Sequence, residues 1–490
     1  MRCVLLPAAL ALAACTVGPD YRAATPPAAP KFKELAGWKP SQPSDTINRG
    51  AWWTIFDDPE LDALEAQVAI SNQNVKSYEA AYRQAQALVQ EARANLYPQL
   101  DLDAGAQRQS SGVGGIGGAS FNRTQSTFTL EGSASWDLDL WGRIRRQVES
   151  SAAAAQVSAA DLANALLSAQ ATLATDYFEL RGQDSLNTLL TRTVKDYTHA
   201  LQITQNQYAA GTASRGDVLT AQAQLQSTQA LQVAVAEARQ QYEHAIAVLA
   251  GRAPADLTIP AAELSSRVPV VPAGVPSALL ERRPDIAAAE RSMQEENALI
   301  GVAVAAYYPD ITLSGLFGFA GNPLSKLINV GNQVWSLGAS GAEVAFQGGY
   351  QQAAVAAAHA GYDQSVATYR QTVLSAFQQV EDQLVALRVL QDQAKAEADA
   401  VASTRRAVDV TLNEYTAGTV AYTSVITEQT LLLTDEQAAL TIAQNRLVAS
   451  VALIEALGGG WQASDLPGRT GGAPDNVGIA PALKDKWWWW

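Results

Sequence analysis

The stretch from Arg143 to Ala210 limits the possible folds of this chain most, because its residue pattern predicts one uninterrupted helix. Apolar residues recur in steps of three and four, which places them on one helix face, and no Pro interrupts them. At about 1.5 Å per residue such a helix is about 100 Å long, too long for one globular domain. It ends at Gly211, a residue suited to the left-handed conformation that terminates helices, and a second helix returns to Gly251. The sequence therefore predicts an elongated helical hairpin.

The same pattern occurs twice, since a shift of 207 positions carries Tyr208 onto Tyr415 and Gly211 onto Gly418. The apolar positions and the end of the return helix move with them. Agreement in register, turn and exit indicates an internal duplication, and two unrelated coiled-coil hairpins are the alternative.

Before each long helix the apolar period changes to two, as in strands. Strand pairs are expected at Leu100–Gln107 with Phe128–Leu140, joined by a Gly-rich loop at 110–120, and at Ile311–Phe319 with Gln333 to about Phe346. Their apolar and polar faces fit a transmembrane barrel, and a small soluble sheet packed on the helices is the alternative. Four strands cannot close a barrel and an open edge cannot lie in lipid, so the membrane interpretation requires several chains to share one barrel.

The N-terminus reads as a secretory signal, with Arg2, an apolar segment and Leu12-Ala-Ala-Cys15. This ending resembles a bacterial lipobox, which predicts that Cys15 becomes the lipidated first residue. Thr16 follows where an Asp often signals inner-membrane retention, so outer-membrane delivery is favoured. An ordinary signal peptide is the alternative.

Composition and motifs argue against other classes. The formal charge of −14 makes nucleic acid an unfavourable partner. The G-x-G-x-x-G match at Gly112–Gly117 precedes a strand and not a helix, so it is a loop. The three histidines stand singly, and nothing resembles a metal site, a cofactor site or an activated nucleophile. We expect no enzyme, no cofactor and no metal.

Asp217, just past the first turn, has two interpretations. Near a helix start its carboxylate favours the helix dipole. In a symmetric pore its copies would form an acidic ring at the narrow end. The equivalent residue in the second repeat is Ser424, so a ring would hold one carboxylate per chain.

Motifs along the chain resemble those of TolC-like outer-membrane efflux proteins, in the lipoprotein branch that works with resistance–nodulation–division pumps. The resemblance runs from Cys15 to about Trp461. It rests on Cys15-Thr-Val-Gly-Pro-Asp-Tyr21, Trp52-Trp-Thr-Ile-Phe-Asp-Asp-Pro-Glu-Leu61, Trp136-Asp-Leu-Asp-Leu-Trp-Gly-Arg143, Tyr208-Ala-Ala-Gly211, Leu280-Glu-Arg-Arg-Pro-Asp-Ile286 and Tyr308-Pro-Asp-Ile-Thr-Leu-Ser-Gly315.

The resemblance implies a mainly α-helical fold with a membrane β-barrel. Two tandem repeats would form a trimeric α-barrel and a shared twelve-strand β-barrel. It also implies lipid anchoring in the outer membrane, extension into the periplasm, and partnership with a periplasmic adaptor and an inner-membrane pump. The implied gate residues are Tyr208, Asp217, Tyr415 and Ser424, and the implied adaptor contacts are Gly211, Thr212, Gly418 and Thr419. Val420 and Ser424 stand where some members carry Arg and Asp.

The expected organisation follows the repeats. Residues 1–14 are a signal peptide, 15–50 a lipidated tether and equatorial segment, 51–251 the first repeat, 252–280 an equatorial linker, 281–458 the second repeat, and 459–490 an equatorial segment and tail. The repeats are expected to hold β-hairpins at about 99–140 and 310–346 and helical hairpins at about 143–250 and 349–457. The tail ends in Trp487–Trp490, which no motif explains.

The predicted function is the passive outer-membrane exit channel of a tripartite efflux pump, passing small molecules such as drugs. The exit duct of a type I protein secretion system is an alternative. A structural coiled-coil lipoprotein that spaces the periplasm is another, although a spacer needs no strand pairs.

Overall fold

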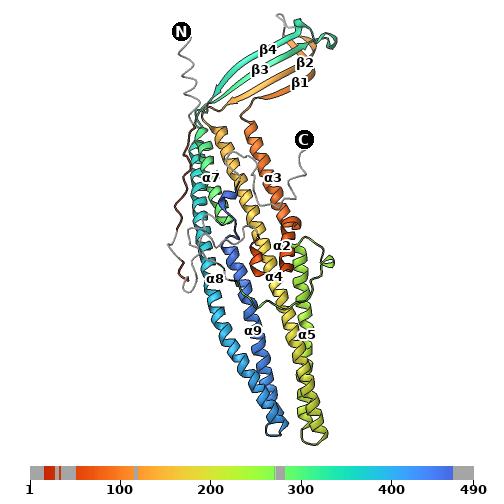
Figure 1. The fold of residues 1–490 in the computed structure, drawn as a ribbon. Coiled ribbons are helices and arrows are strands. Elements are labelled where there is room, and N and C mark those ends of the chain that lie inside the picture. Colours follow the sequence, from red (N-terminus) through yellow and green to blue (C-terminus); the bar gives the residue numbers. More distant parts are fainter. Residues whose placement is uncertain are drawn as a thin grey trace.

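Long helices run most of the length of the molecule, with a sheet at one end and two tight turns at the other (Figure 1). The computed structural model describes residues 16–27, 32–34, 51–114, 120–269, 271 and 282–466. Cys15 and Trp487–Trp490 lie outside the described residues. Helix α4 spans Arg143–Ala209 and α5 spans Arg215–Leu249. In the second repeat α8 spans Tyr350–Thr416 and α9 spans Tyr422–Ala456. The predicted helix from Arg143 is therefore α4, and the matched lengths of both hairpins agree with a duplication.

Shorter helices flank the sheet-proximal half of these hairpins. Helix α2 spans Pro59–Ser71, α3 spans Gln73–Ala94 and α7 spans Pro284–Ala305. The start of α2 is fixed by Asp58, whose carboxylate accepts hydrogen bonds from the N–H groups of Glu60 and Leu61. The 3₁₀ turns are η1 Trp52–Phe56, η2 Pro254–Asp256, η3 Leu324–Lys326, η4 Val330–Asn332 and η5 Ala463–Asp465.

The described strands form one antiparallel sheet in the order β1-β2-β3-β4. They span Gln99–Gly114, Ser120–Leu138, Asp310–Gly321 and Gln333–Ala342. Strands β1 and β2 run further into 110–120 than the predicted loop allows, and β4 ends before Phe346. Pairing explains the extension, because Ser110 lies opposite Thr124 and each strand supplies hydrogen-bond partners for the other.

The register keeps the predicted apolar and polar faces apart. Leu130 of β2 lies opposite Ala104 of β1 and Phe319 of β3. Its neighbour Glu131 lies opposite Asp103 and Gly318 on the other face. The same register places Leu102, Trp136, Leu313, Phe317, Trp335 and Leu337 on the Leu130 face.

The largest core lies near the middle of the molecule, where both hairpins meet flanking segments. Tyr177, Phe178, Val380, Leu384 and Leu453 are buried there. The segments also contribute, since Phe32, Trp52, Phe56 and Ile259 pack in the same cluster.

Polar bonds fasten these flanking segments to the helices. Asp184 of α4 accepts hydrogen bonds from Arg239 at 2.6 Å and from the backbone N–H of Ala262 at 3.1 Å. On the second hairpin the Glu381 carboxylate accepts the backbone N–H groups of Lys33 and Glu34, the latter at 2.9 Å. These bonds thus attach segments that are far apart in sequence to the long helices of both hairpins.

Candidate entrance site at the helical turns

The two turns farthest from the sheet share one backbone geometry (Figure 1). Gly211 has φ of 80° and Gly418 has φ of 75°, a region in which other residues are strained. The N–H and the hydroxyl of Thr212 donate to the Gln207 carbonyl at 2.9 and 3.0 Å. Thr419 makes the same two bonds in α8, at 2.9 Å each. These bonds satisfy a carbonyl group in the last turn of each helix, and the residues of both turns remain exposed.

Tyr415 connects the second turn to helix α4. Its side chain is 6% exposed, and its ring centroid lies 5.1 Å from that of Tyr422. Its hydroxyl donates to the buried Oγ1 of Thr204 at 3.5 Å, and Ala221 and Val425 complete the cluster. Burial raises the pKa of Tyr422 to about 12, so this phenol stays neutral at physiological pH.

Tyr208 occupies the equivalent position in the first repeat but is 48% exposed. The difference follows from the next helix, because the first residue of α5 is Arg215 whereas that of α9 is Tyr422. Among the described residues, Tyr415 therefore has an aromatic partner and Tyr208 has none. Within one chain the two implied gate tyrosines therefore have different environments, one buried and one exposed.

Asp217 is engaged at the start of α5. Its carboxylate accepts the backbone N–H of Ser214 at 2.9 Å, and its own N–H donates to the Ser214 hydroxyl at 3.1 Å. This reciprocal capping box satisfies two N–H groups that the helix leaves without partners. Ser424 is exposed in the first turn of helix α9, whose N-terminus has no side-chain cap. Asp217 therefore has a local helix-capping role, which is compatible with a second role at an aperture.

Above the turns, one carboxylate joins three helices. Glu436 of α9 accepts hydrogen bonds from Arg192 of α4 at 2.9 and 3.0 Å and from Arg405 of α8. The Glu436 side chain is only 11% exposed, so these ion pairs are screened less than pairs on an open surface. This connection cannot be read from the sequence, because Arg192 and Arg405 lie 244 and 31 residues from Glu436 and no short motif joins them.

At the opposite end, the Trp-Gly-Arg motif joins sheet to helix. Asp139 caps α4 by accepting the N–H groups of Ile144 and Arg145 at 3.0 and 2.9 Å. The Trp141 indole donates to the Pro309 carbonyl at 2.9 Å and stacks on Tyr308 at 4.8 Å. This motif therefore fixes the direction in which α4 leaves the sheet.

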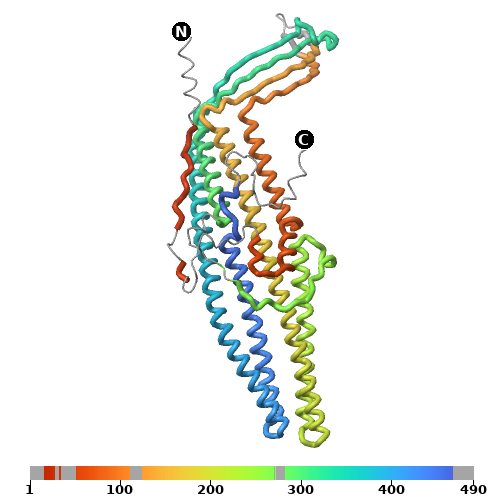
Figure 2. Tube along the Cα trace, viewed as in Figure 1, coloured from red at the N-terminus to blue at the C-terminus, as the bar shows by residue number. Residues whose placement is uncertain are grey.

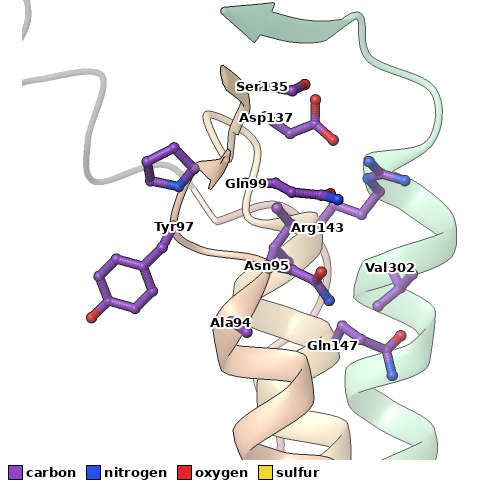
Figure 3. A pocket seen from close by; sticks show the side chains of 11 residues that line it. Ala94, Asn95, Tyr97, Gln99, Ser135, Asp137, Arg143, Gln147 and Val302 are labelled. Carbon is purple, nitrogen blue, oxygen red and sulfur yellow. The ribbon is translucent and has the colours of Figure 1, made fainter. Parts of the chain in front are cut away.

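A recess of about 590 Å³ lies beside this junction (Figure 3). Gln99, Asp137 and Arg143 reach toward it from the strands and from α4. Asp137 belongs to the polar face of β2, whereas its neighbour Trp136 lies on the apolar face. Its carboxylate accepts the Thr312 hydroxyl at 2.7 Å, so the recess continues the polar face of the sheet.

The N-terminal segment is held against the same junction. The N–H of Val17 donates to the Trp141 carbonyl at 3.1 Å, and Arg146 forms an ion pair with Asp20 at 2.9 Å. Gly18 packs against Gly301 of α7 so closely that an added Cβ would lie 2.5 Å from its Cα. Figure 2 shows this red segment descending along the helices from the base of the sheet.

The described residues contain no cluster of side chains suited to a metal ion. Across the same ranges, no helix combines the length and apolar character needed to cross a membrane.

Comparisons with known proteins agree with this geometry. The family model described as "Outer membrane efflux protein" matches residues 64–252 and 275–459. The pyoverdine export outer membrane protein OpmQ of Pseudomonas aeruginosa is 31% identical, over 94% of this chain and 96% of the relative. The antibiotic efflux pump outer membrane protein ArpC of Pseudomonas putida is 28% identical, over 92% and 94%. The solved structure of the outer-membrane channel OprN has a TM-score of 0.85 and 30% identity, covering 91% of this chain and all of that chain.

Fold and comparisons together define an outer-membrane channel protein of efflux pumps, not an enzyme. The chain belongs to the outer membrane efflux protein family. The predicted resemblance, fold class and general function are therefore confirmed.

Proposed function

We propose that three copies of this chain form the exit duct of a tripartite efflux pump that carries small organic molecules. The observation that supports this best is the four-stranded sheet, which has one apolar face. The outer edges of β1 and β4 have no partner strand among the described residues. Backbone groups on such edges cannot remain unpaired in lipid, and four strands are too few to close on themselves. Three chains would supply a closed barrel of twelve strands.

Aromatic residues at the base of the sheet support its position in a membrane. Tyr97, Trp136, Tyr307 and Tyr308 are exposed there in the single chain. Tyr and Trp gather at membrane–water boundaries because their rings are amphipathic. The base of the sheet would thus lie at the periplasmic surface of the outer membrane.

Lipidation of Cys15 is the second part of the proposal. Thr16, the next residue, lies against Gly142, where an added Cβ would be 2.8 Å from the Thr16 methyl group. An acylated Cys15 would therefore start beside the aromatic residues at the base of the sheet, within reach of the inner leaflet. Mass spectrometry of the mature N-terminus tests this part, and an unmodified N-terminus would reject it.

The turns are the proposed entrance. Gly211, Thr212, Gly418 and Thr419 are exposed and would contact a periplasmic adaptor, while Asp217 would line the aperture. Relatives are named for export of pyoverdine and of antibiotics, which favours small molecules as cargo. The proposed organisation keeps 15–50, 252–280 and 459–490 as equatorial segments beside the two repeats.

Native mass spectrometry and planar-bilayer conductance test the duct. We expect a complex of three chains that forms discrete channels after insertion. A stable single chain without conductance would refute the shared barrel, and a conducting complex with another number of chains would refute the trimer alone.

A further inference from the structure

The apolar face of the sheet, which is the Leu130 face, has two ends. Trp136 lies at the end nearest the helices, and Ser126 lies ten positions earlier on the same face of β2. At about 3.4 Å per residue and a strand tilt of about 40°, ten residues rise about 25 Å, which is the height of the apolar band of membrane barrels. With Trp136 at the periplasmic surface of the membrane, Ser126 would therefore lie at the extracellular surface.

The chemical character of this face changes at the level of Ser126. On β1 the face carries apolar residues that lie opposite Ala134, Gly132, Leu130 and Phe128, namely Leu100, Leu102, Ala104 and Ala106. The next pair on the same face is Arg108 with Ser126. Arg108 is exposed and Ser126 is half-buried. The apolar band thus ends at a cation with a hydroxyl group opposite it.

This end of the sheet is also positively charged. The sequence has no Asp or Glu at 104–130 or at 316–336, although the formal charge of the whole chain is −14. The first carboxylates beyond these stretches on β1 and β2 lie on the opposite face of the sheet, the Glu131 face. Arg108 and Lys326 are both exposed and form no ion pair with another described residue. Their charges are therefore available to an anionic partner outside the chain.

The loop between β3 and β4 adds apolar groups at the same level (Figure 1). Strand β3 ends at Gly321, which lies opposite Phe128, so the loop begins at the end of the apolar band. Three aliphatic side chains of the loop are largely exposed: Leu324 (60%), Ile328 (73%) and Val330 (85%). Such groups are unfavourable in water and favourable at the edge of lipid, where a neighbouring lysine keeps its charge among the headgroups.

We propose that Arg108, Ser126 and Lys326, which we call the outer rim, bind the phosphate groups of lipid headgroups at the extracellular surface. The Arg108 guanidinium would donate two parallel N–H bonds to phosphate oxygens, and the Ser126 hydroxyl would donate another. The Lys326 ammonium would act on a phosphate as a compact charge. The acyl chains of the same lipids would lie on the apolar face below.

The outer rim should distinguish lipids by their headgroup charge. Phosphatidylglycerol carries a net negative charge, whereas the choline of phosphatidylcholine neutralises its phosphate. An anionic lipid surface attracts each nearby Lys or Arg enough to change binding by about fivefold. This inference rests on the proposed membrane position of the sheet, because only there would lipid headgroups reach the outer rim.

Native mass spectrometry of the detergent-released complex measures this binding as dissociation constants for the two lipids with matched acyl chains. We expect the unaltered protein to prefer phosphatidylglycerol. Arg108→Gln and Lys326→Gln should each weaken phosphatidylglycerol binding about fivefold and change phosphatidylcholine binding less than about twofold. Arg108→Lys keeps the charge and should lose less affinity than Arg108→Gln. Arg215→Gln is the matched control, because it removes an exposed cation at the start of α5, far from the sheet.

The free headgroup tests whether the ligand is a lipid. Glycerol 3-phosphate carries the phosphate without acyl chains, so it should not displace phosphatidylglycerol at equal concentration. Equal displacement would overturn the proposal in favour of a site for free phosphate. Equal affinity for the two lipids in the unaltered protein would also overturn it, as would unchanged phosphatidylglycerol binding in Arg108→Gln and Lys326→Gln, or an equal loss in Arg215→Gln.

The same spectra give the number of chains, which separates this inference from the proposed function. A complex of three chains whose phosphatidylglycerol binding ignores both substitutions would refute the outer rim alone. A single chain would refute the shared barrel and the outer rim with it. Because both altered side chains are exposed, neither substitution removes a packed group that folding requires.

Discussion

Replacing Tyr415 by Ala should loosen the entrance, because this side chain joins α8 to α4 and to α9. The change removes a ring that is 6% exposed, its contact with Tyr422 at 5.1 Å and its hydrogen bond to Thr204. Truncation of a buried aromatic costs about 3–5 kcal/mol, and a site near a helix end relaxes more than a central one, so we take about 3 kcal/mol. The equilibrium between the tight and loosened turns would shift by about a hundredfold.

Single-channel recording in planar bilayers measures this effect as longer or more frequent openings. Tyr415→Phe should behave almost like the unaltered protein, because it keeps the ring and loses only a long 3.5 Å hydrogen bond.

Tyr208→Ala is the matched control, since it removes the repeat-equivalent tyrosine, which is 48% exposed. Equal opening in Tyr208→Ala and Tyr415→Ala would refute the argument from burial. An unchanged Tyr415→Ala channel would show that the tyrosine cluster does not hold the entrance.

Three further predictions concern other levels of the molecule. Leu130→Arg should make assembly in the outer membrane less favourable by about 2–4 kcal/mol. Glu131→Gln, on the opposite face, should assemble normally and alter conductance. Equal oligomer fractions of the two variants in membrane extracts would show that the faces are misassigned. Asp217→Asn keeps an acceptor for the Ser214 N–H and should weaken channel block by a trivalent cation added on the periplasmic side. Asp217→Ala should in addition destabilise α5 by about 1 kcal/mol. Unchanged block in planar bilayers would leave Asp217 with its capping role alone. Burial, and secondarily Asp62, raise the pKa of Glu65 well above its usual value, so the folded state binds this proton more tightly than the unfolded state. Stability should therefore fall as pH rises from about 4.5 through the folded pKa. In thermal unfolding, Glu65→Gln should flatten that decline, and Glu60→Gln on the same helix should not.

The long helices and the sheet faces were predictable because their signals are local. An unbroken apolar period defined α4 to within one residue of its observed end at Ala209. Alternation placed Leu130 and Glu131 on opposite faces, as the register shows. The ends of β1 and β2 were not predictable in this way, because pairing between Ser110 and Thr124 outweighs the loop-like composition around them.

The candidate entrance site was predictable only in part, since repeat symmetry determines which residues are equivalent but not how each is buried. Tyr208 and Tyr415 are equivalent in sequence, yet Tyr415 is buried because Tyr422 follows its turn. An aromatic residue at the first position of only one return helix was the available signal. Glu436 offered no such signal in the sequence, because its contact with Arg192 forms only when the two hairpins pack together.

The attachment of the N-terminal segment has a consequence for the order in which the chain matures. The residues around Pro19 are synthesised early, yet the Pro19 carbonyl accepts a hydrogen bond from Asn297, which lies 278 positions later. Their other partners, Trp141 and Arg146, also emerge long after them. This early segment can therefore take its final position only after most of the chain has been made. Until then none of its hydrogen bonds to Trp141, Arg146 and Asn297 can form, so this amino-terminal segment is among the last parts of the fold to be fixed.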